Sequence, residues 1–192
     1  MIAIVKYNAG NLRSVENALK RLGATYEITD SADRLHAADH VIFPGVGEAS
    51  SAMSYLRSRG LDQVIRDLRR PFLGICLGLQ LMCAHSEEGN TECLGIFEEQ
   101  VKRFPDTGKV PHMGWNNFKK VKGPLFNGIL LEDDVYYVHS YYAEVGDETS
   151  AICEYLVPFS AAIQKNNFYG VQFHPEKSAE VGEKLIENFL KL

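Results

Sequence analysis

Apolar positions in the first ninety residues fall into short continuous runs that alternate with stretches of helical periodicity. The continuous runs, "IAIVKY", "ATYEIT", "HVIFPG" and "FLGIC", have the length and composition of buried strands. Between the first two, "NLRSVENALKRLG" places Leu12, Val15, Leu19 and Leu22 on one face of a helix, and Gly23 follows where that helix would end. Strands separated by helices of this length predict a parallel sheet with helices on both faces.

Further helices are predicted in "SADRLHAA", "ASSAMSYLRSRG", "LDQVIRDLRR" and, directly after the fourth strand, "LGLQLMCAHSEE". After about residue 95 the pattern becomes β-rich, in "NNFKKV", "VYYVHSYYAEV" and "SAICEY". "SAAIQK" and "FYGVQF" are joined by Asn166 and Asn167, which tolerate the positive φ of a tight hairpin. The chain closes on the amphipathic "VGEKLIENFLKL".

These elements predict one α/β domain over residues 1–192. It should have a mainly parallel central sheet flanked by helices and a more antiparallel, β-rich C-terminal part. No repeat, low-complexity tract or linker interrupts the chain.

Charge and composition favour small-molecule chemistry. The formal net charge is -5, and no block of lysine and arginine forms a basic patch, so we expect no nucleic-acid partner. The start, "MIAIVKYN", lacks a basic leader region, and no apolar run reaches membrane-spanning length. We therefore expect a cytoplasmic protein with no membrane partner.

The four cysteines lie far apart without a C-x-x-C pair, which predicts free thiols in a reducing compartment. His36 and His40 have the spacing of a metal pair on a helix, but "HAADH" runs straight into a strand and offers no third ligand nearby. We expect neither a metal site nor a cofactor.

Cys76 stands between glycines at the junction of a predicted strand and a predicted helix, in "GICLG". A nucleophile at such a sharp turn needs small neighbours, whereas a buried structural cysteine does not. "PGVG" ends the preceding strand of the predicted sheet, so its backbone N–H groups should lie at the same edge. Together with the amide of Leu77, they are candidates for stabilising an oxyanion.

A base for this thiol is offered by "GVQFHPEKS". His174 follows a strand, Pro175 keeps the chain extended, and Glu176 lies two residues on, so the two side chains should point the same way. This spacing predicts a Cys76–His174–Glu176 triad. The alternative is a surface turn at the HPE segment and an unreactive buried thiol.

"GICLGLQ" together with "GVQFHPEKS" resembles the class I (triad) glutamine amidotransferases. Four more segments, "YNAGNLRSV", "PGVG", "PHMGWN" and "YYVHSY", resemble one branch of that family, the glutaminase subunits of imidazole glycerol phosphate synthases of histidine biosynthesis. These segments extend from residue 7 to residue 178, and the resemblance therefore spans nearly the whole chain.

The resemblance implies hydrolysis of glutamine to glutamate and ammonia, with Cys76 as nucleophile, His174 as base and acid, and Glu176 as its orienting carboxylate. It also implies oxyanion-hole amides at Val46 and Leu77. The residues that it places around the glutamine substrate are Gly47, Gln80, Glu88, His139, Ser140 and Tyr141. Two of these have simpler interpretations, Gln80 as a solvated helix position and His139 as a core histidine.

The same resemblance implies a heterodimer with a cyclase subunit that has a (β/α)8 barrel. Ammonia would pass through the barrel to N'-phosphoribulosyl-formimino-AICAR-phosphate, giving imidazole glycerol phosphate and AICAR. Pro111, Met113, Trp115 and Asn116 of "PHMGWN" form the expected contact with it, since tryptophan is a frequent interface anchor. The alternative is that Trp115 is a core aromatic.

Two other functions fit part of the pattern. One is the glutaminase subunit of a different synthase, such as those for pyridoxal phosphate or anthranilate, in which "PHMGWN" and "YNAGNL" are not expected. The other is a non-catalytic thiol sensor on the same fold, although such a protein would not need both His174 and Glu176.

Overall fold

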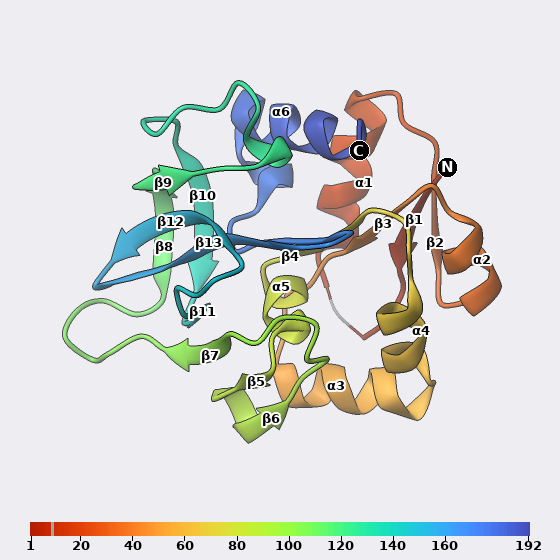
Figure 1. Cartoon of the computed structure of the whole chain (residues 1–192), viewed down its shortest axis with the longest axis horizontal. Coiled ribbons are helices and arrows are strands. Elements are labelled where there is room, and N and C mark those ends of the chain that lie inside the picture. Colours follow the sequence, from red (N-terminus) through yellow and green to blue (C-terminus); the bar gives the residue numbers. More distant parts are fainter. Residues whose placement is uncertain (9) are drawn as a thin grey trace.

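A mixed eight-stranded sheet forms the centre of the structure, a computed structural model that describes residues 1–8 and 10–192 (Figure 1). Its strand order is β2-β1-β3-β4-β14-β13-β12-β9. The strands are β1 (Ile2–Val5), β2 (Tyr26–Thr29), β3 (His40–Phe43), β4 (Phe72–Ile75), β9 (Lys120–Val121), β12 (Thr149–Tyr155), β13 (Val157–Lys165) and β14 (Phe168–Val171). The first five in the order pair in parallel and the last three are joined by antiparallel pairs, as the sequence predicts.

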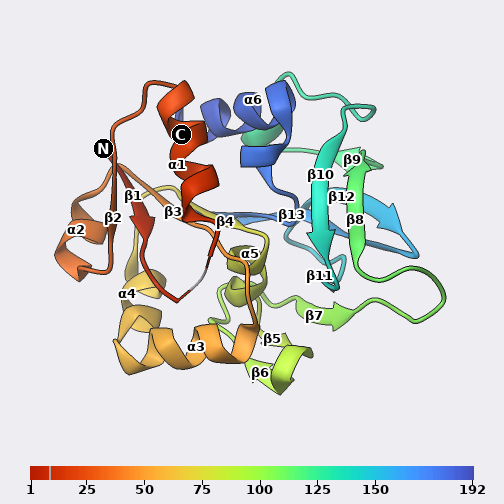
Figure 2. The same ribbon diagram turned by 180° about the vertical axis from the view of Figure 1, so that it is seen from behind.

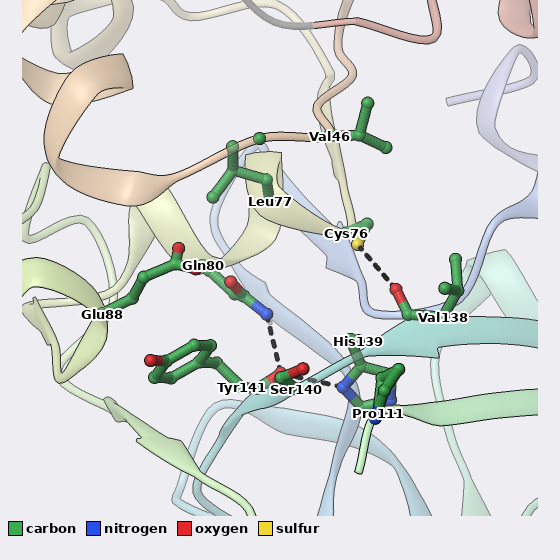
Figure 3. A pocket seen from close by; sticks show the side chains of 11 residues that line it. Val46, Cys76, Leu77, Gln80, Glu88, Pro111, Val138, His139, Ser140 and Tyr141 are labelled. Carbon is green, nitrogen blue, oxygen red and sulfur yellow. Dashed lines mark hydrogen bonds between the residues drawn. The ribbon is translucent and has the colours of Figure 1, made fainter.

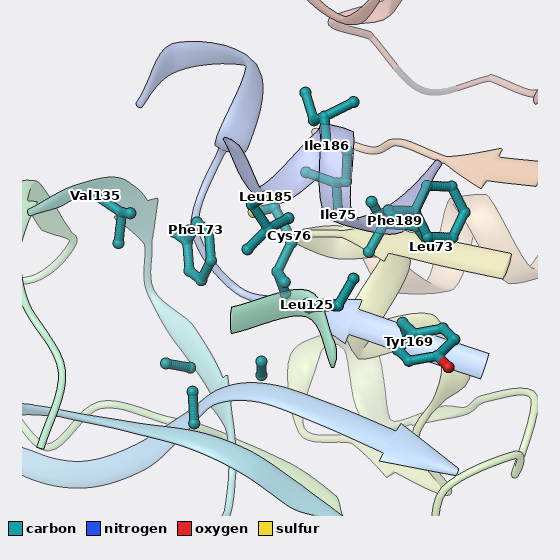
Figure 4. Close-up of a cluster of buried hydrophobic side chains, with 14 of the residues drawn as sticks. Leu73, Ile75, Cys76, Leu125, Val135, Tyr169, Phe173, Leu185, Ile186 and Phe189 are labelled. Atoms are coloured by element: carbon teal, nitrogen blue, oxygen red, sulfur yellow. The ribbon is translucent and has the colours of Figure 1, made fainter. Parts of the chain in front are cut away.

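Helices cover both faces of this sheet (Figures 1 and 2). They are α1 (Leu12–Arg21), α2 (Ala32–Ala37), α3 (Ala49–Ser58), α4 (Leu61–Asp67), α5 (Leu77–Met82) and α6 (Ala179–Phe189). α1 and α6 lie on one face, where Leu185, Ile186 and Phe189 pack on Leu73 and Ile75 of β4 (Figure 4). α3, α4 and α5 enclose a second apolar core on the other face.

Shorter strands form two additional pieces at one end of the large sheet. β8 (His112–Asn116) and β10 (Val135–His139) make an antiparallel ribbon. β11 (Tyr141–Ala143), β7 (Gln100–Arg103), β5 (His85–Ser86) and β6 (Thr91–Glu92) make a small sheet. Three 3-10 turns complete the elements, η1 (Glu88–Asn90), η2 (Pro124–Phe126) and η3 (Pro175–Lys177).

The helix predicted over residues 77–88 is wrong in its second half, because α5 ends at Met82. The carbonyl oxygens of Leu81, Met82 and Cys83 accept N–H groups from residues 94–97 instead of from a following helical turn. Tertiary hydrogen bonds thus override the apolar periodicity of this stretch. The hairpin at Asn166 is confirmed, since this residue has φ 53°.

Ala9, within the "YNAGNLRSV" segment, lies outside the described residues. In the part of the chain that the structure describes, no helix is both long enough and apolar enough to cross a membrane.

Candidate active site

Cys76 occupies the turn from β4 into α5 with φ 53° and ψ -107°, a backbone conformation that side chains rarely adopt. The neighbouring glycines explain how the turn is packed. A Cβ at position 78 would lie 1.9 Å from the carbonyl oxygen of Phe43, and one at position 74 would lie 2.8 Å from the backbone of Gly78. Only glycine at both positions lets α5 lie directly on the sheet, which holds the thiol at the edge where the parallel strands end.

His174 and Glu176 reach the same edge because β14 is the parallel neighbour of β4. His174 Nδ1 lies 2.8 Å from Glu176 Oε1, and both side chains are fully buried. Burial opposes the charged imidazolium, but the nearby Cys76 and Glu176 outweigh it and raise the pKa of His174 to about 10. Nε2 is buried and has no hydrogen-bond partner among the described residues. This nitrogen is therefore the one that can exchange a proton at the thiol.

A residue that the sequence analysis missed also holds the carboxylate. Asn11, at the start of α1, donates from Nδ2 to Glu176 Oε1 over 2.5 Å. It adopts φ 71°, the left-handed conformation that asparagine tolerates better than most residues. In the sequence, the feature that could have indicated this role is an asparagine directly after a glycine, between the first strand and its helix.

A cavity of about 280 Å³ opens beside Cys76 (Figure 3). Its walls contain every residue expected to surround the substrate, together with the two expected oxyanion residues and Pro111. The lining residues are Val46, Gly47, Cys76, Leu77, Gln80, Glu88, Pro111, Val138, His139, Ser140 and Tyr141.

Two predicted substrate residues meet at one backbone carbonyl in this cavity. Gln80 Nε2 donates to the oxygen of Tyr141 over 2.8 Å, and His139 Nδ1 bonds to the same oxygen over 2.8 Å. Gln80 is buried rather than solvated. On another wall, Glu88 Oε2 accepts the N–H of Ala49 over 2.9 Å, and burial raises the pKa of this carboxyl.

The two expected oxyanion amides do not converge in this structure. The Leu77 N–H donates to the carbonyl oxygen of Gly45 over 3.3 Å. Because C=O and N–H point in opposite directions across a trans peptide, the N–H of Val46 is directed away from Leu77. The Val46 carbonyl in turn accepts the N–H of Gly10 over 3.3 Å. An oxyanion hole at Val46 and Leu77 requires the Gly45–Val46 peptide to turn over.

The four residues expected to contact a partner lie on β8 and directly before it. Met113 and Trp115 are 60% and 55% exposed, so the alternative of a core tryptophan is wrong. Asn116 turns inward, where its Nδ2 donates to the carbonyl of Glu154 over 3.1 Å, and Pro111 lines the cavity.

Metal ligands are not assembled in residues 1–8 and 10–192, since no group of three or more His, Cys, Asp or Glu side chains there is placed to hold an ion. The four cysteines are all buried and free.

The family model "Glutamine amidotransferase class-I" matches residues 3–192. The chain belongs to the class-I glutamine amidotransferases. Among curated proteins of this family, it is 57% identical to the imidazole glycerol phosphate synthase subunit HisH of Bacteroides fragilis, over 100% of this chain and 99% of that one. It is also 46% identical to the imidazole glycerol phosphate synthase subunit HisH 2 of Legionella pneumophila, over 100% and 98%.

Solved structures support the amidotransferase fold independently. A putative GMP synthase component from Thermoplasma acidophilum superposes with a TM-score of 0.76 at 22% identity, covering 100% of this chain and 92% of that one. A second structure, described as a glutamine amidotransferase, also gives 0.76, at 18% identity and with 99% and 97% coverage.

Proposed function

We propose that this chain, as one amidotransferase domain over residues 1–192, is the glutaminase subunit of an imidazole glycerol phosphate synthase. The observation that carries the proposal is the position of Cys76 at the wall of a cavity large enough for one amino acid, with His174 close to the thiol and hydrogen-bonded to Glu176. The identity to subunits of that synthase over the full length of the chain supports this choice among amidotransferases.

In the proposed reaction, the thiolate of Cys76 attacks the side-chain amide carbon of glutamine. The C–N bond breaks as His174 gives a proton to the departing ammonia, leaving a thioester on Cys76. Water then loses a proton to His174 and attacks the thioester, which releases glutamate and restores the thiolate. Glu176 orients the imidazole through Nδ1 and stabilises its charge without exchanging the proton itself.

Glutamine would occupy the cavity between the segment at Gly47, Gln80 of α5 and residues 139–141, where β10 passes into β11. The carboxylate of Glu88 is suited to the amino group of the substrate, because it is the acidic side chain among the lining residues. Val46 and Leu77 would supply the oxyanion donors once the Gly45–Val46 peptide has turned.

The ammonia needs an acceptor site, since ammonia in neutral water is mostly protonated and no longer nucleophilic. We propose a cyclase partner with a (β/α)8 barrel, with Met113 and Trp115 at the centre of the contact and Pro111 and Asn116 beside them. A cytoplasmic location also stays a prediction.

The test compares two nitrogen sources in the complex of this chain with its cyclase. Cys76→Ala should abolish formation of imidazole glycerol phosphate from glutamine, because no comparable nucleophile replaces the thiolate. With high ammonium at alkaline pH the same complex should still form product, since ammonia then reaches the cyclase from solution. His174→Ala should behave alike, and Glu176→Gln should keep part of the activity.

Wild-type product formation from glutamine in the Cys76→Ala complex would contradict the proposed nucleophile. Absence of glutamate release from the wild-type complex, with intact use of ammonium, would instead favour the thiol sensor.

A further inference from the structure

A chain of buried hydrogen bonds runs behind the glutamine cavity and ends on the nucleophilic sulfur. Gln172, which follows β14, donates from Nε2 to Cys76 Sγ over 3.6 Å. Its Oε1 accepts from Gln80 Nε2 over 3.0 Å, and that nitrogen also donates to the Tyr141 carbonyl over 2.8 Å. Gln172 is wholly buried and is not among the residues that line the cavity. It therefore touches the reacting sulfur without facing the substrate.

The Tyr141 carbonyl fixes the direction of this chain, because a carbonyl oxygen can only accept. Gln80 must turn its NH₂ group toward that oxygen, so the group that it offers to Gln172 is also a donor. Gln172 must then turn its oxygen toward Gln80 and its NH₂ group toward Cys76. The orientation of both amides follows from one backbone atom.

The same carbonyl also orders two histidines on its other side. His139 must carry its proton on Nδ1 to bond to Tyr141, so its Nε2 accepts from His112 Nδ1 over 3.0 Å. His112 Nε2 then accepts from the amide of Asn116 over 3.3 Å. Burial lowers the pKa of His139 to about 3 and that of His112 to about 4, so both stay neutral. The network thus has a single proton arrangement.

The sulfur at the end of this network is placed as an acceptor. As a donor, the thiol has a distant partner among the described residues, the Val138 carbonyl 4.0 Å away (Figure 3). As an acceptor, the sulfur receives an N–H group of the Gln172 amide. An N–H donor binds a thiolate more strongly than a thiol, because the bond then carries a full charge on the acceptor. The titratable groups around this sulfur include His174 and Tyr7, and His139 lines the same cavity.

We propose that Gln172 is a thiolate-stabilising residue, which lowers the energy of ionised Cys76 through its side-chain N–H. The proposal rests on the proposed role of Cys76 as nucleophile. It extends the triad by a neutral donor that acts on the sulfur from the side opposite to solvent. If Gln172 served only as packing, a methionine of similar size and shape would replace it without any effect on ionisation.

The test measures alkylation of Cys76 by iodoacetamide as a function of pH, in the full chain and without glutamine. Only the thiolate displaces iodide, so the midpoint of the profile reports its ionisation. Gln172→Met should move the midpoint upward by about one pH unit and slow alkylation below it by roughly 10-fold, with the plateau at high pH unchanged. The peptide that contains residue 76 is followed by mass spectrometry, because three other cysteines are present.

Asn188→Leu is the matched control. It removes another buried amide, which binds the carbonyls of Leu125 and Asn127 and contacts neither Cys76 nor Gln80. This variant should keep the wild-type midpoint. A wild-type midpoint in folded Gln172→Met would overturn the proposal.

A second measurement uses the wild-type chain and does not depend on the folding of any variant. The side-chain ¹⁵N–H resonances of Gln172 should shift with the same midpoint as alkylation and lose that transition once Cys76 is alkylated. Their failure to respond to pH would also overturn the proposal. Because neither experiment requires glutamine hydrolysis, a shifted midpoint in a complex without glutaminase activity would refute the proposed function and leave the role of Gln172 standing.

Discussion

At the scale of single residues, Glu176 of the proposed triad is held by a residue outside the triad as well as by His174. Glu176 Oε1 accepts from both His174 Nδ1 and Asn11 Nδ2, so Asn11 sets the position from which the carboxylate orients the imidazole. Its left-handed backbone conformation places the amide where it can do so.

Asn11→Gly should lower kcat for glutamine hydrolysis by roughly 10-fold, the scale of one hydrogen bond to a charged group, with KM nearly unchanged. Glycine keeps the left-handed conformation at no steric cost, so the variant removes the amide alone. Steady-state kinetics of the complex measure the effect. Asn8→Gly, which removes a neighbouring amide that bonds to the carbonyl of Ser51, is the control and should retain kcat. Equal kcat in Asn11→Gly and wild type would assign Asn11 to the helix start only.

Sequence patterns were enough to propose the Cys76–His174–Glu176 triad, but they did not indicate Asn11 and Gln172, which hydrogen-bond to it. The glycines around Cys76 and the two-residue spacing of His174 and Glu176 are local features, and the structure brings these three residues together. Asn11 and Gln172 differ because their partners, Glu176 and Cys76, lie far away in the sequence, so their contacts exist only after the sheet has formed. The orientation of the Gly45–Val46 peptide is likewise set by a hydrogen bond from the Leu77 N–H to the Gly45 carbonyl, which no spacing rule reveals.

At the scale of elements, the β8–β10 ribbon presents two faces of different character. Met113 and Trp115 point outward, while His112 and Asn116 point inward, as strand alternation requires. Trp115 rests edge-on against Tyr136 of β10, with ring centroids 5.9 Å apart. The outward face is therefore a preformed aromatic surface on a paired strand.

Trp115→Ala should weaken binding of the cyclase by about 2 kcal/mol or more, because a tryptophan anchor loses its buried contacts. Its exposure implies little effect on folding of the isolated chain. Titration calorimetry with the cyclase and thermal unfolding of the isolated chain measure these quantities. Unchanged affinity would remove Trp115 from the proposed contact. Leu130→Ala, at another exposed apolar position, is the control for truncating a surface side chain.

The inward face makes the fold sensitive to acid. His112 is stacked between Tyr137 and Tyr155, with centroids 4.8 and 4.1 Å away, and its pKa of about 4 lies below the ordinary value of about 6.5. Between these two pKa values, His112 therefore binds a proton in the unfolded chain but stays neutral in the folded chain. This contribution to stability is complete above about pH 6.5 and is lost as the pH falls toward 4.

His112→Gln should consequently reduce the proton uptake on unfolding between pH 4.5 and 6.5 by about one proton, seen as a shallower dependence of the unfolding free energy on pH. Urea unfolding at several pH values measures this slope. His36→Gln, at an exposed helix position, is the control. The same slope in His112→Gln and wild type would mean that His112 is charged in the folded protein.

At the scale of the whole molecule, the edge of the sheet holds all three residues of the proposed triad, but the two proposed oxyanion amides do not converge there. The proposed nucleophile, base and carboxylate lie together, whereas the Leu77 N–H donates to the Gly45 carbonyl. The carbonyl of the next residue, Val46, accepts a separate hydrogen bond from the Gly10 N–H, in the loop before α1. The hydrogen bond from Leu77 to the Gly45 carbonyl must therefore break before the Gly45–Val46 peptide can turn over and form an oxyanion hole.

The chain alone should therefore hydrolyse glutamine slowly, and the cyclase with its acceptor ligand should raise kcat by roughly 10²- to 10³-fold, the effect of one oxyanion donor. Glutamate release with and without both components measures the ratio. Addition of the acceptor ligand without the cyclase is the control. Full activity of the chain alone would show that the Gly45–Val46 peptide turns without help.

The strand order also determines when the thiol becomes reactive during synthesis of the chain. β14 inserts between β4 and β13, so the sheet stays divided until residues 168–171 have left the ribosome. Cys76 emerges long before His174, Glu176 and Gln172, so a nascent chain carries it without these three neighbours. The order of translation thus leaves the proposed nucleophile without its proposed base until β14 can complete the sheet.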